Sequence, residues 1–393
     1  MQRSKTLFSK KILTLFVGIF MAICVVLLSA CTPLNQTPQP EIPPTTTPST
    51  TPETPSSNLS STTTRTEMAE NMLGALATVK VLRSTDSYRS SMGSGVAIHA
   101  DGYLITNYHV IYNEAQTPDD YYLNLEMMVG TEFKTNIEAE LLWYNASLDM
   151  AILKSSQTFN SFATLSDRWI DTNNRLRIAE AIWTLGTPYA QDLWGTYSEG
   201  TISSSLYRVG VTGVGQSTYY HNYLIQHSAP ISSGNSGGPL FDSAGKLIGL
   251  NTCGYSSSSN KTANNLFFAA PIYPITLVLD KVISAYKSGQ KYTTPSLNVS
   301  GYDKAAVSSF TEDGVYVQGV SETSSAYAQG LTVSAVIKGL GSAICQNAND
   351  PSYKKITCGY DLIYALLNYY PGDTITLFYT YNGQNLSMNV ELS

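Results

Sequence analysis

Residues 232–240 read "SSGNSGGPL", and the interpretation of the whole chain starts from this stretch. Glycine or proline occupies four of the nine positions. These residues favour tight turns and close backbone approach, and they disfavour a helix or a regular strand. We therefore expect Ser236 to lie on a loop whose backbone is shaped around it.

The residues on either side of this loop predict short strands separated by turns. In "GSGVAIHADGYLITNYHV" (93–110), apolar residues flank Asp101-Gly102, a dipeptide that favours hairpin turns. Further strands are expected at 123–129, 138–145, 149–155, 179–186, 199–205, 223–229, 246–252 and 265–272. So many strands predict an all-β sandwich or barrel, closed by a helix near 275–289.

A polar joint, "QKYTTPS" (290–296), separates this region from a smaller unit. A helix at 359–370 and a hairpin that turns at Asn382-Gly383 indicate a compact α+β module. We place the two domains at 67–290 and 295–393.

The amino terminus has the pattern of an export signal. A basic stretch and the apolar run 12–30 precede Cys31, and "LSAC" (28–31) resembles a lipoprotein signal box in which Cys31 is lipidated. The alternative is an uncleaved membrane anchor, because the apolar run is about long enough to span a bilayer. Both alternatives place the rest of the chain outside the cytoplasm. Residues 32–66, rich in Thr, Pro and Ser, are expected to be a disordered tether.

The charge balance and the cysteines limit the classes of partner and of site that the chain is expected to have. After the first thirty residues the chain carries 19 basic and 29 acidic side chains, so nucleic acid is not an expected partner. Cys345 and Cys358 flank a polar loop, and a disulfide there would contribute about 3 kcal/mol; two free thiols are the alternative. No metal site is expected, because no histidine follows His227.

Ser236 becomes a nucleophile only beside a base that a third group orients. His109 ends an expected strand, a rigid element suited to aim an imidazole, and His227 is not excluded by its spacing. His99 and His221 have turn or polar surroundings. Asp149 lies among apolar residues in "NASLDMAILK" (145–154), where a buried charge needs a partner such as a histidine N–H.

The order His109, Asp149, Ser236 is that of chymotrypsin-like serine proteases. "TNYHV" (106–110), "SLDMAIL" (147–153), "GNSGGPL" (234–240), "GKLIGLNT" (245–252) and "NLFFAAPI" (265–272) resemble the protease domain of the HtrA (high-temperature-requirement) family. This resemblance implies a chymotrypsin-like double β-barrel over most of 67–288. It also implies Ser236 as nucleophile, His109 as general base and acid, and Asp149 as the orienting group.

The same resemblance assigns further residues. The backbone N–H groups of Gly234 and Ser236 would form the oxyanion hole. Because Asn235 is neutral, it cannot pair with a cleaved amino terminus, so we expect regulation by loop conformation. The substrate pocket would be formed by Pro230, Ile231, Thr252 and Cys253, without a carboxylate, which favours small or medium aliphatic residues before the cut.

The C-terminal unit resembles the PDZ domain attached to HtrA proteases, in "GVYVQGVSETSSAYAQGL" (314–331) and "DLIYALLNYYPGDTITLFYTYNGQ" (361–384). Leu297, Asn298 and Val299 would form the loop that captures a C-terminal peptide, with Asn298 where the family usually has glycine. A purely structural or regulatory role for this module is the alternative.

The sequence thus predicts a lipid-anchored, extracytoplasmic serine endopeptidase that degrades unfolded or damaged envelope proteins. The resemblance implies a homotrimer, and no metal or organic cofactor is implied. The rival hypotheses are a catalytically idle peptide-binding scaffold or holdase, and a hydrolase of small esters.

Overall fold

The computed structural model describes residues 64–168, 175–189, 191–212, 219–254, 266–304, 307 and 309–393. The predicted signal segment with Cys31, and nearly all of the predicted tether, lie outside these residues. Within the described part of the chain, no helix combines the length and the apolar character needed to cross a membrane.

Residues 76–155 form a closed barrel of six antiparallel strands in the order β1-β2-β3-β6-β5-β4. The strands are β1 (Leu76–Arg83), β2 (Arg89–His99), β3 (Tyr103–Thr106), β4 (Tyr121–Val129), β5 (Glu132–Asn145) and β6 (Met150–Ser155). Between β3 and β4 the chain forms the short helices η1 (Tyr108–Val110) and α3 (Tyr112–Gln116). The predicted Asp101-Gly102 turn joins β2 to β3, with Gly102 at φ +91°.

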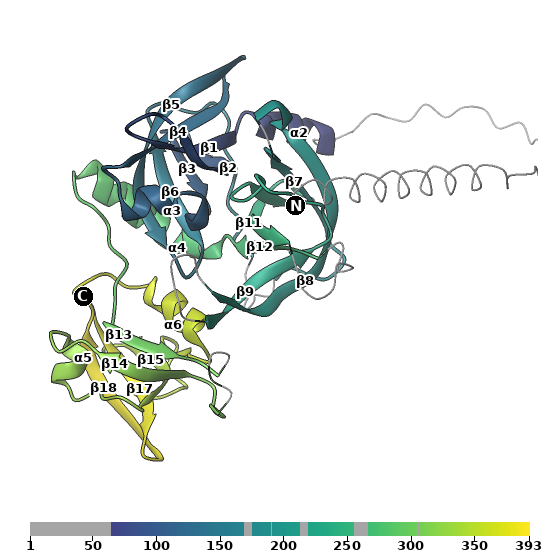
Figure 1. Cartoon of the computed structure of the whole chain (residues 1–393). Helices are drawn as coiled ribbons and strands as arrows, with labels where there is room; N and C mark the ends of the chain where they lie inside the picture. The colour runs from purple at the N-terminus through teal and green to yellow at the C-terminus, as the bar shows by residue number, and fades with distance from the viewer. Residues whose placement is uncertain are drawn as a thin grey trace, which may run out of the picture. The chain divides into compact units, whose positions relative to one another are not determined.

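A second closed barrel follows, in the order β10-β11-β12-β9-β8-β7. Its strands are β7 (Ala181–Gly186), β8 (Thr196–Thr212), β9 (Tyr219–His227), β10 (Pro239–Asp242), β11 (Leu247–Gly254) and β12 (Phe267–Pro271), with η2 (Gln191–Leu193) before β8. Figure 1 shows the first barrel in blue beside the second in teal. The strand pattern alone was compatible with either a sandwich or a barrel. The structure has the double β-barrel that the resemblance implied.

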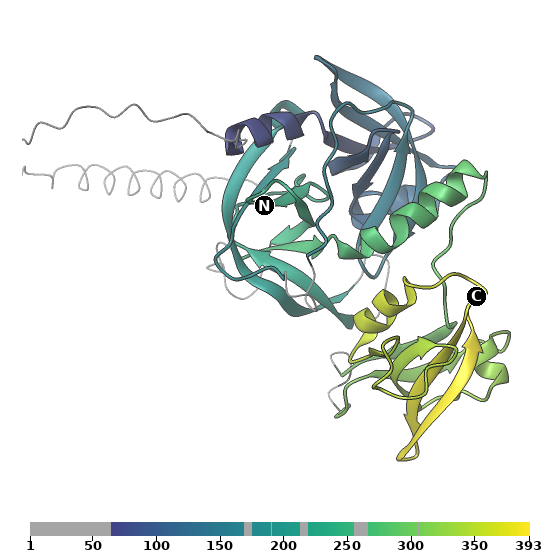
Figure 2. The same ribbon diagram turned by 180° about the vertical axis from the view of Figure 1, so that it is seen from behind.

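Two helices flank the barrels. Helix α4 (Tyr273–Lys287) buries Ile275, Val278 and Val282, which recur at helical spacing, and it packs against β5 of the first barrel (Figure 2). Helix α2 (Arg65–Leu73) begins before the expected boundary at residue 67. The side chains of Thr64 and Glu67 cap each other's backbone N–H groups there, a capping box that the spacing T-x-x-E could have revealed.

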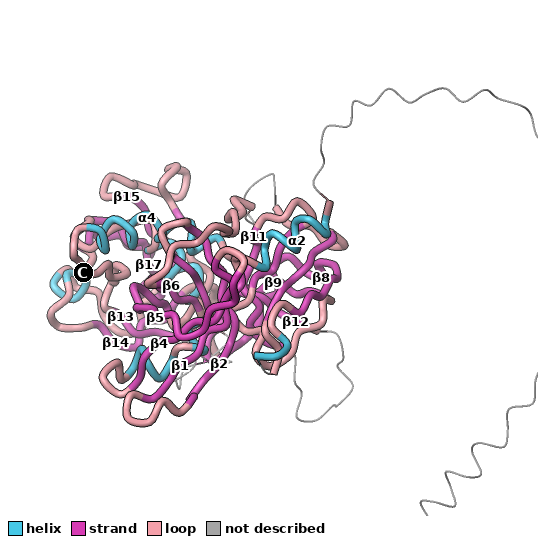
Figure 3. Tube along the Cα trace, turned by 90° about the horizontal axis from the view of Figure 1, so that it is seen from above, coloured by secondary structure: helices cyan, strands magenta, loops and turns pink. Residues whose placement is uncertain are grey.

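The C-terminal module is a six-stranded sheet with the path β13-β14-β15-β17-β18, to which β16 adds beside β15. Its elements are β13 (Val299–Tyr302), β14 (Val315–Val320), α5 (Ser325–Ala328), β15 (Val336–Ser342), β16 (Lys354–Lys355), α6 (Gly359–Leu366), β17 (Thr374–Tyr381) and β18 (Gln384–Glu391). The predicted hairpin turns at Asn382-Gly383, both at positive φ as a type I′ turn requires. Strands dominate throughout the described chain (magenta in Figure 3).

The expected disulfide between Cys345 and Cys358 is not formed. Cys345 lies in the loop after β15, where its thiol donates to the carbonyl of Asn347, 3.6 Å away. Cys358 is the N-cap residue of α6. Both thiols are buried, so each residue acts as a small apolar group in its own packing environment.

Candidate active site

His109 and Asp149 meet because two neighbouring strands bring their ends together. Strands β3 and β6 pair antiparallel, with Thr106 opposite Ala151, so η1 after β3 lies beside the residue that precedes β6. Nδ1 of His109 lies 2.9 Å from Oδ2 of Asp149, and the His109 backbone N–H donates to Oδ1 at 3.0 Å. The pairing expected from the apolar surroundings of Asp149 is therefore present.

A third side chain, that of Thr252 on β11, completes this contact from the second barrel. Its Oγ1 donates to Oδ2 of Asp149 at 2.7 Å. Thr252 had been expected on the wall of a substrate pocket, but its hydroxyl is committed to Asp149. The sequence carried no local signal for this role, since the two residues are 103 positions apart.

The electrostatics favour a charged imidazole at this site. Burial by itself opposes the protonated form of His109. The charge of Asp149 and the hydrogen bond to it outweigh that effect, and the pKa of His109 is raised above its ordinary value of 6.5.

Ser236 lies on the loop between β9 and β10, and it is half-buried. Its Oγ donates to the carbonyl of Thr252 at 3.1 Å. Thr252 therefore contacts Asp149 through its side chain and Ser236 through its backbone. These two contacts place the serine, the carboxylate and the histidine around one residue of β11.

The backbone beside Ser236 requires glycine at two positions. Gly234 and Gly237 have φ values of +99° and +82°, a backbone region that residues other than glycine rarely occupy. A Cβ on Gly234 would collide with the carbonyl of Thr187, and one on Gly237 with the carbonyl of Ser94. Glycine is thus needed both for the turn and for the close approach of neighbouring backbone.

Three hydrogen bonds fix the backbone of this loop. The Ser94 hydroxyl donates to the carbonyl of Gly234 at 2.8 Å, and the Ser94 N–H donates to the carbonyl of Ser236 at 2.7 Å. The N–H of Tyr189 donates to the carbonyl of Ser233 at 2.7 Å. Among the described residues, the N–H groups of Gly234 and Ser236 donate to no backbone acceptor.

The remaining residues considered for the site are those of the substrate pocket and the three other histidines. Pro230 is exposed, Ile231 is half-buried, and the side chain of Cys253 lies outside the described residues. His99 is 43% exposed beside Asp101, and His221 also falls outside the described side chains. His227 is fully buried on β9, where burial lowers its pKa to about 4, and it makes no hydrogen bond to Asp149 or Ser236.

Of the residues expected to bind peptides, Leu297 and Asn298 precede β13 in the C-terminal module, and Val299 is the first residue of that strand. Asn298 has φ +53°, the left-handed conformation that glycine adopts readily and asparagine tolerates. Its Nδ2 donates to Oγ of Ser393 at 2.7 Å, and Ser296 and Ser393 exchange two backbone hydrogen bonds of 3.0 Å. Leu297 is buried in the core of the module.

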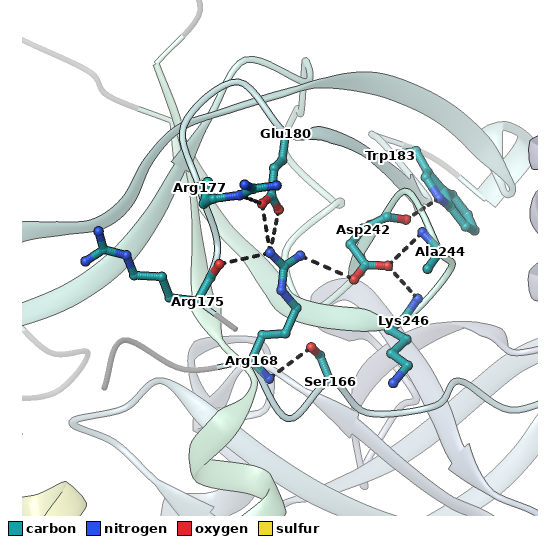
Figure 4. Close-up of polar contacts among 9 residues, drawn as sticks. All are labelled: Ser166, Arg168, Arg175, Arg177, Glu180, Trp183, Asp242, Ala244 and Lys246. Atoms are coloured by element: carbon teal, nitrogen blue, oxygen red, sulfur yellow. Dashed lines mark hydrogen bonds and ion pairs between the residues drawn. The ribbon is translucent and has the colours of Figure 1, made fainter. Parts of the chain in front are cut away.

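Sequence reasoning also missed a charged network at one end of the second barrel (Figure 4). The half-buried guanidinium of Arg168 donates to Glu180 at 2.8 Å and to the carbonyl of Arg175 at 2.9 Å. It also lies 3.6 Å from the carboxylate of Asp242. Asp242 accepts the backbone N–H groups of Ala244 and Lys246, so the network ties the segment before β7 to the turn after β10.

Comparison with known proteins agrees with this architecture. Residues 93–250 match the model of the trypsin-like peptidase domain. The chain is 30% identical over 250 residues to the serine endoprotease DegS of Haemophilus influenzae, covering 63% of this chain and 64% of that protein. It is 27% identical over 307 residues to the probable periplasmic serine endoprotease DegP-like of Bartonella henselae, covering 77% of this chain and 53% of that protein.

Among solved structures, the HtrA-type protease AlgW with a tripeptide superposes with a TM-score of 0.56 at 25% identity. The match covers 83% of this chain and 95% of AlgW. The alignments with the two curated relatives thus span between about half and two thirds of their length, whereas the structural match spans nearly all of AlgW.

Proposed function

We propose that this chain is an HtrA family serine endopeptidase that cleaves unfolded polypeptides outside the cytoplasm. The observation that carries the proposal is the paired His109 and Asp149, held with Ser236 around Thr252. The same residue types in the same order serve acyl transfer in trypsin-like enzymes. A relative named as periplasmic supports the compartment.

In the proposed reaction, neutral His109 takes the proton of Ser236 as its Oγ attacks the scissile carbonyl. Because Nδ1 of His109 is bound to Asp149, Nε2 is the nitrogen that accepts this proton. The Ser236 hydroxyl, which here donates to the Thr252 carbonyl, turns to His109 when substrate binds. The imidazolium then protonates the leaving amine, and water hydrolyses the acyl-enzyme by the reverse sequence.

The oxyanion of the tetrahedral intermediate would be bound by the N–H groups of Gly234 and Ser236. The peptide that carries the Gly234 N–H is already held at the Ser233 carbonyl by the N–H of Tyr189, and the peptide that carries the Ser236 N–H is held at the Asn235 carbonyl by the N–H of Gly238. Little rearrangement is therefore needed when charge develops. Loss of one such donor typically slows the chemical step by about a hundredfold or more.

Specificity and anchoring belong to the same proposal. Pro230, Ile231 and Cys253 would border the pocket for the residue before the cut, which lacks a carboxylate and so favours small or medium aliphatic side chains. The loop Leu297–Val299 would hold a C-terminal carboxylate, and the left-handed conformation of Asn298 supports this because glycine adopts the same conformation readily. A lipid on Cys31 would tether a homotrimer to the membrane.

The test is degradation of unfolded casein by the full-length chain in mild detergent, beside its Ser236→Ala variant. We expect fragments only from the parent, and labelling of the parent by a fluorophosphonate that requires an activated serine. A folded parent that neither cleaves nor reacts, yet prevents casein from aggregating, would favour the idle scaffold or holdase. Cleavage of small esters but not of casein would favour an esterase.

A further inference from the structure

We propose that Asn107 is a positioning residue that holds Asp149 and the loop of Ser236 in their reacting arrangement. This inference rests on the proposed function, since it concerns the same site. It assigns a role to a side chain that does not touch the substrate.

The carboxamide of Asn107 contacts both segments at once. Its Nδ2 donates to the backbone carbonyl of Asp149 at 2.8 Å. Its Oδ1 accepts the N–H of Gly237, the residue after Ser236, at 2.7 Å. Asn107 is also the N-cap residue of η1, two positions before His109. One side chain therefore joins the three segments that carry His109, Asp149 and Ser236.

The contact with Asp149 matters because that residue has a strained backbone. Asp149 has φ +54°, a left-handed conformation that costs free energy in residues other than glycine. Such a conformation persists only where neighbouring contacts enforce it. The hydrogen bond from Nδ2 of Asn107 is one of those contacts, and without it Asp149 can relax and draw its carboxylate away from His109.

The contact with Gly237 links the two barrels. The N–H of Gly237 is shared between Oδ1 of Asn107 in the first barrel and the carbonyl of Asn251 in the second. Asn107 is fully buried, so neither of its polar groups can exchange its partner for bulk water. Asparagine suits the position because its amide supplies a donor and an acceptor together, whereas ionised aspartate supplies acceptors alone.

The experiment compares the full-length parent with Asn107→Ala and Asn107→Asp. Asn107→Asp keeps the shape and the acceptor for Gly237 but loses the donor to Asp149. The matched control is Asn124→Ala, which removes another buried asparagine, on β4 of the same barrel. Circular dichroism shows which variants are folded. If Asn107→Ala does not fold, the comparison with the parent is made with Asn107→Asp.

Two readouts separate positioning from general destabilisation. On a fluorogenic peptide, we expect kcat of either Asn107 variant to fall by about a hundredfold while KM changes by less than about twofold. The acid limb of the pH profile should also move to lower pH, because Asp149 no longer supports the charged imidazole. Asn124→Ala should change neither the kinetic constants nor the profile.

Proton NMR of the chain with isotope-labelled histidine tests the contact without activity. The chain has four histidines, and the Nδ1–H of His109 bound to Asp149 should give a low-field resonance. Loss of this resonance in the Asn107 variants but not in Asn124→Ala supports the proposal. An unchanged resonance with a kcat close to that of the parent overturns it. If the parent neither cleaves nor labels, the proposed function fails, while the resonance still decides the role of Asn107.

Discussion

The N–H of Tyr189 donates a 2.7 Å hydrogen bond to the carbonyl of Ser233, and so fixes the peptide unit that also carries the N–H of Gly234. Because a trans peptide is planar, its carbonyl and its N–H point in opposite directions. Holding the Ser233 carbonyl toward Tyr189 therefore directs the Gly234 N–H away from it. Loop 187–189 thus sets the orientation of a proposed oxyanion donor.

Ser94 fixes the next peptide of the same loop, and its removal should slow catalysis. Ser94→Ala loses the donor to the Gly234 carbonyl and the acceptor of the Thr187 N–H. We expect kcat on a peptide substrate to fall by roughly tenfold to a hundredfold with little change in KM. Ser155→Ala, at a buried serine of β6, is the control. Equal losses in both variants would argue against a specific role for Ser94.

The side chain of Thr252 should contribute to catalysis through its hydroxyl. Thr252→Val keeps the side-chain shape but removes the donor to Asp149, leaving the carboxylate with one fewer hydrogen bond. A hydrogen bond to a charged group contributes about 1.5 kcal/mol or more, so we expect kcat/KM to fall by roughly tenfold. Thr252→Ser should restore most of the rate. A Thr252→Val enzyme as active as the parent would contradict this role.

The raised pKa of His109 predicts the pH dependence of the reaction. His109 must be neutral to accept the serine proton, so kcat/KM should rise with pH through a midpoint above 6.5. Asp149→Asn removes the interactions that raise this pKa, and the midpoint should move to lower pH as the rate falls by about four powers of ten. A parent midpoint at or below 6.5 in steady-state kinetics would be inconsistent with the geometry.

The same shift has a consequence for stability. Native His109 binds its proton more tightly than the unfolded chain does. The stabilisation of the native state is therefore complete below about pH 6.5, the pKa of histidine in the unfolded chain. It is lost as pH rises through the native pKa of His109. The free energy of unfolding of Asp149→Asn should lack this component when both proteins are unfolded in urea across that range.

The network at Arg168 should stabilise the second barrel. Arg168→Met leaves the carboxylates of Glu180 and Asp242, which are 19% and 8% exposed, without their shared cation. We expect the free energy of unfolding in urea to fall by about 2 to 4 kcal/mol. Arg177 also pairs with Glu180 but is 78% exposed, so Arg177→Met should cost less than about 1 kcal/mol. Similar losses in both variants would contradict the importance of burial.

Most of the fold could be predicted from local patterns. Alternating apolar residues and the Asp101-Gly102 and Asn382-Gly383 turns indicated strands and hairpins that the structure contains. Such signals lie within a few neighbouring residues, where side-chain periodicity and turn conformation act. Helix α2 was missed because the polar run before it masked the capping pair of Thr64 and Glu67.

By itself, the sequence predicted His109, Asp149 and Ser236 as the catalytic residues, because each lies in a short motif whose neighbouring residues indicate its chemistry. Only the tertiary structure assigned Thr252 to Asp149, Ser94 to Gly234 and the charged partners to Arg168, and it left Cys345 and Cys358 without a disulfide. Thr252 and Ser94 lie 103 and 140 positions from their partners. Contacts at such separations arise only when two closed barrels bring distant segments together, and no local pattern records which buried donor will face which acceptor.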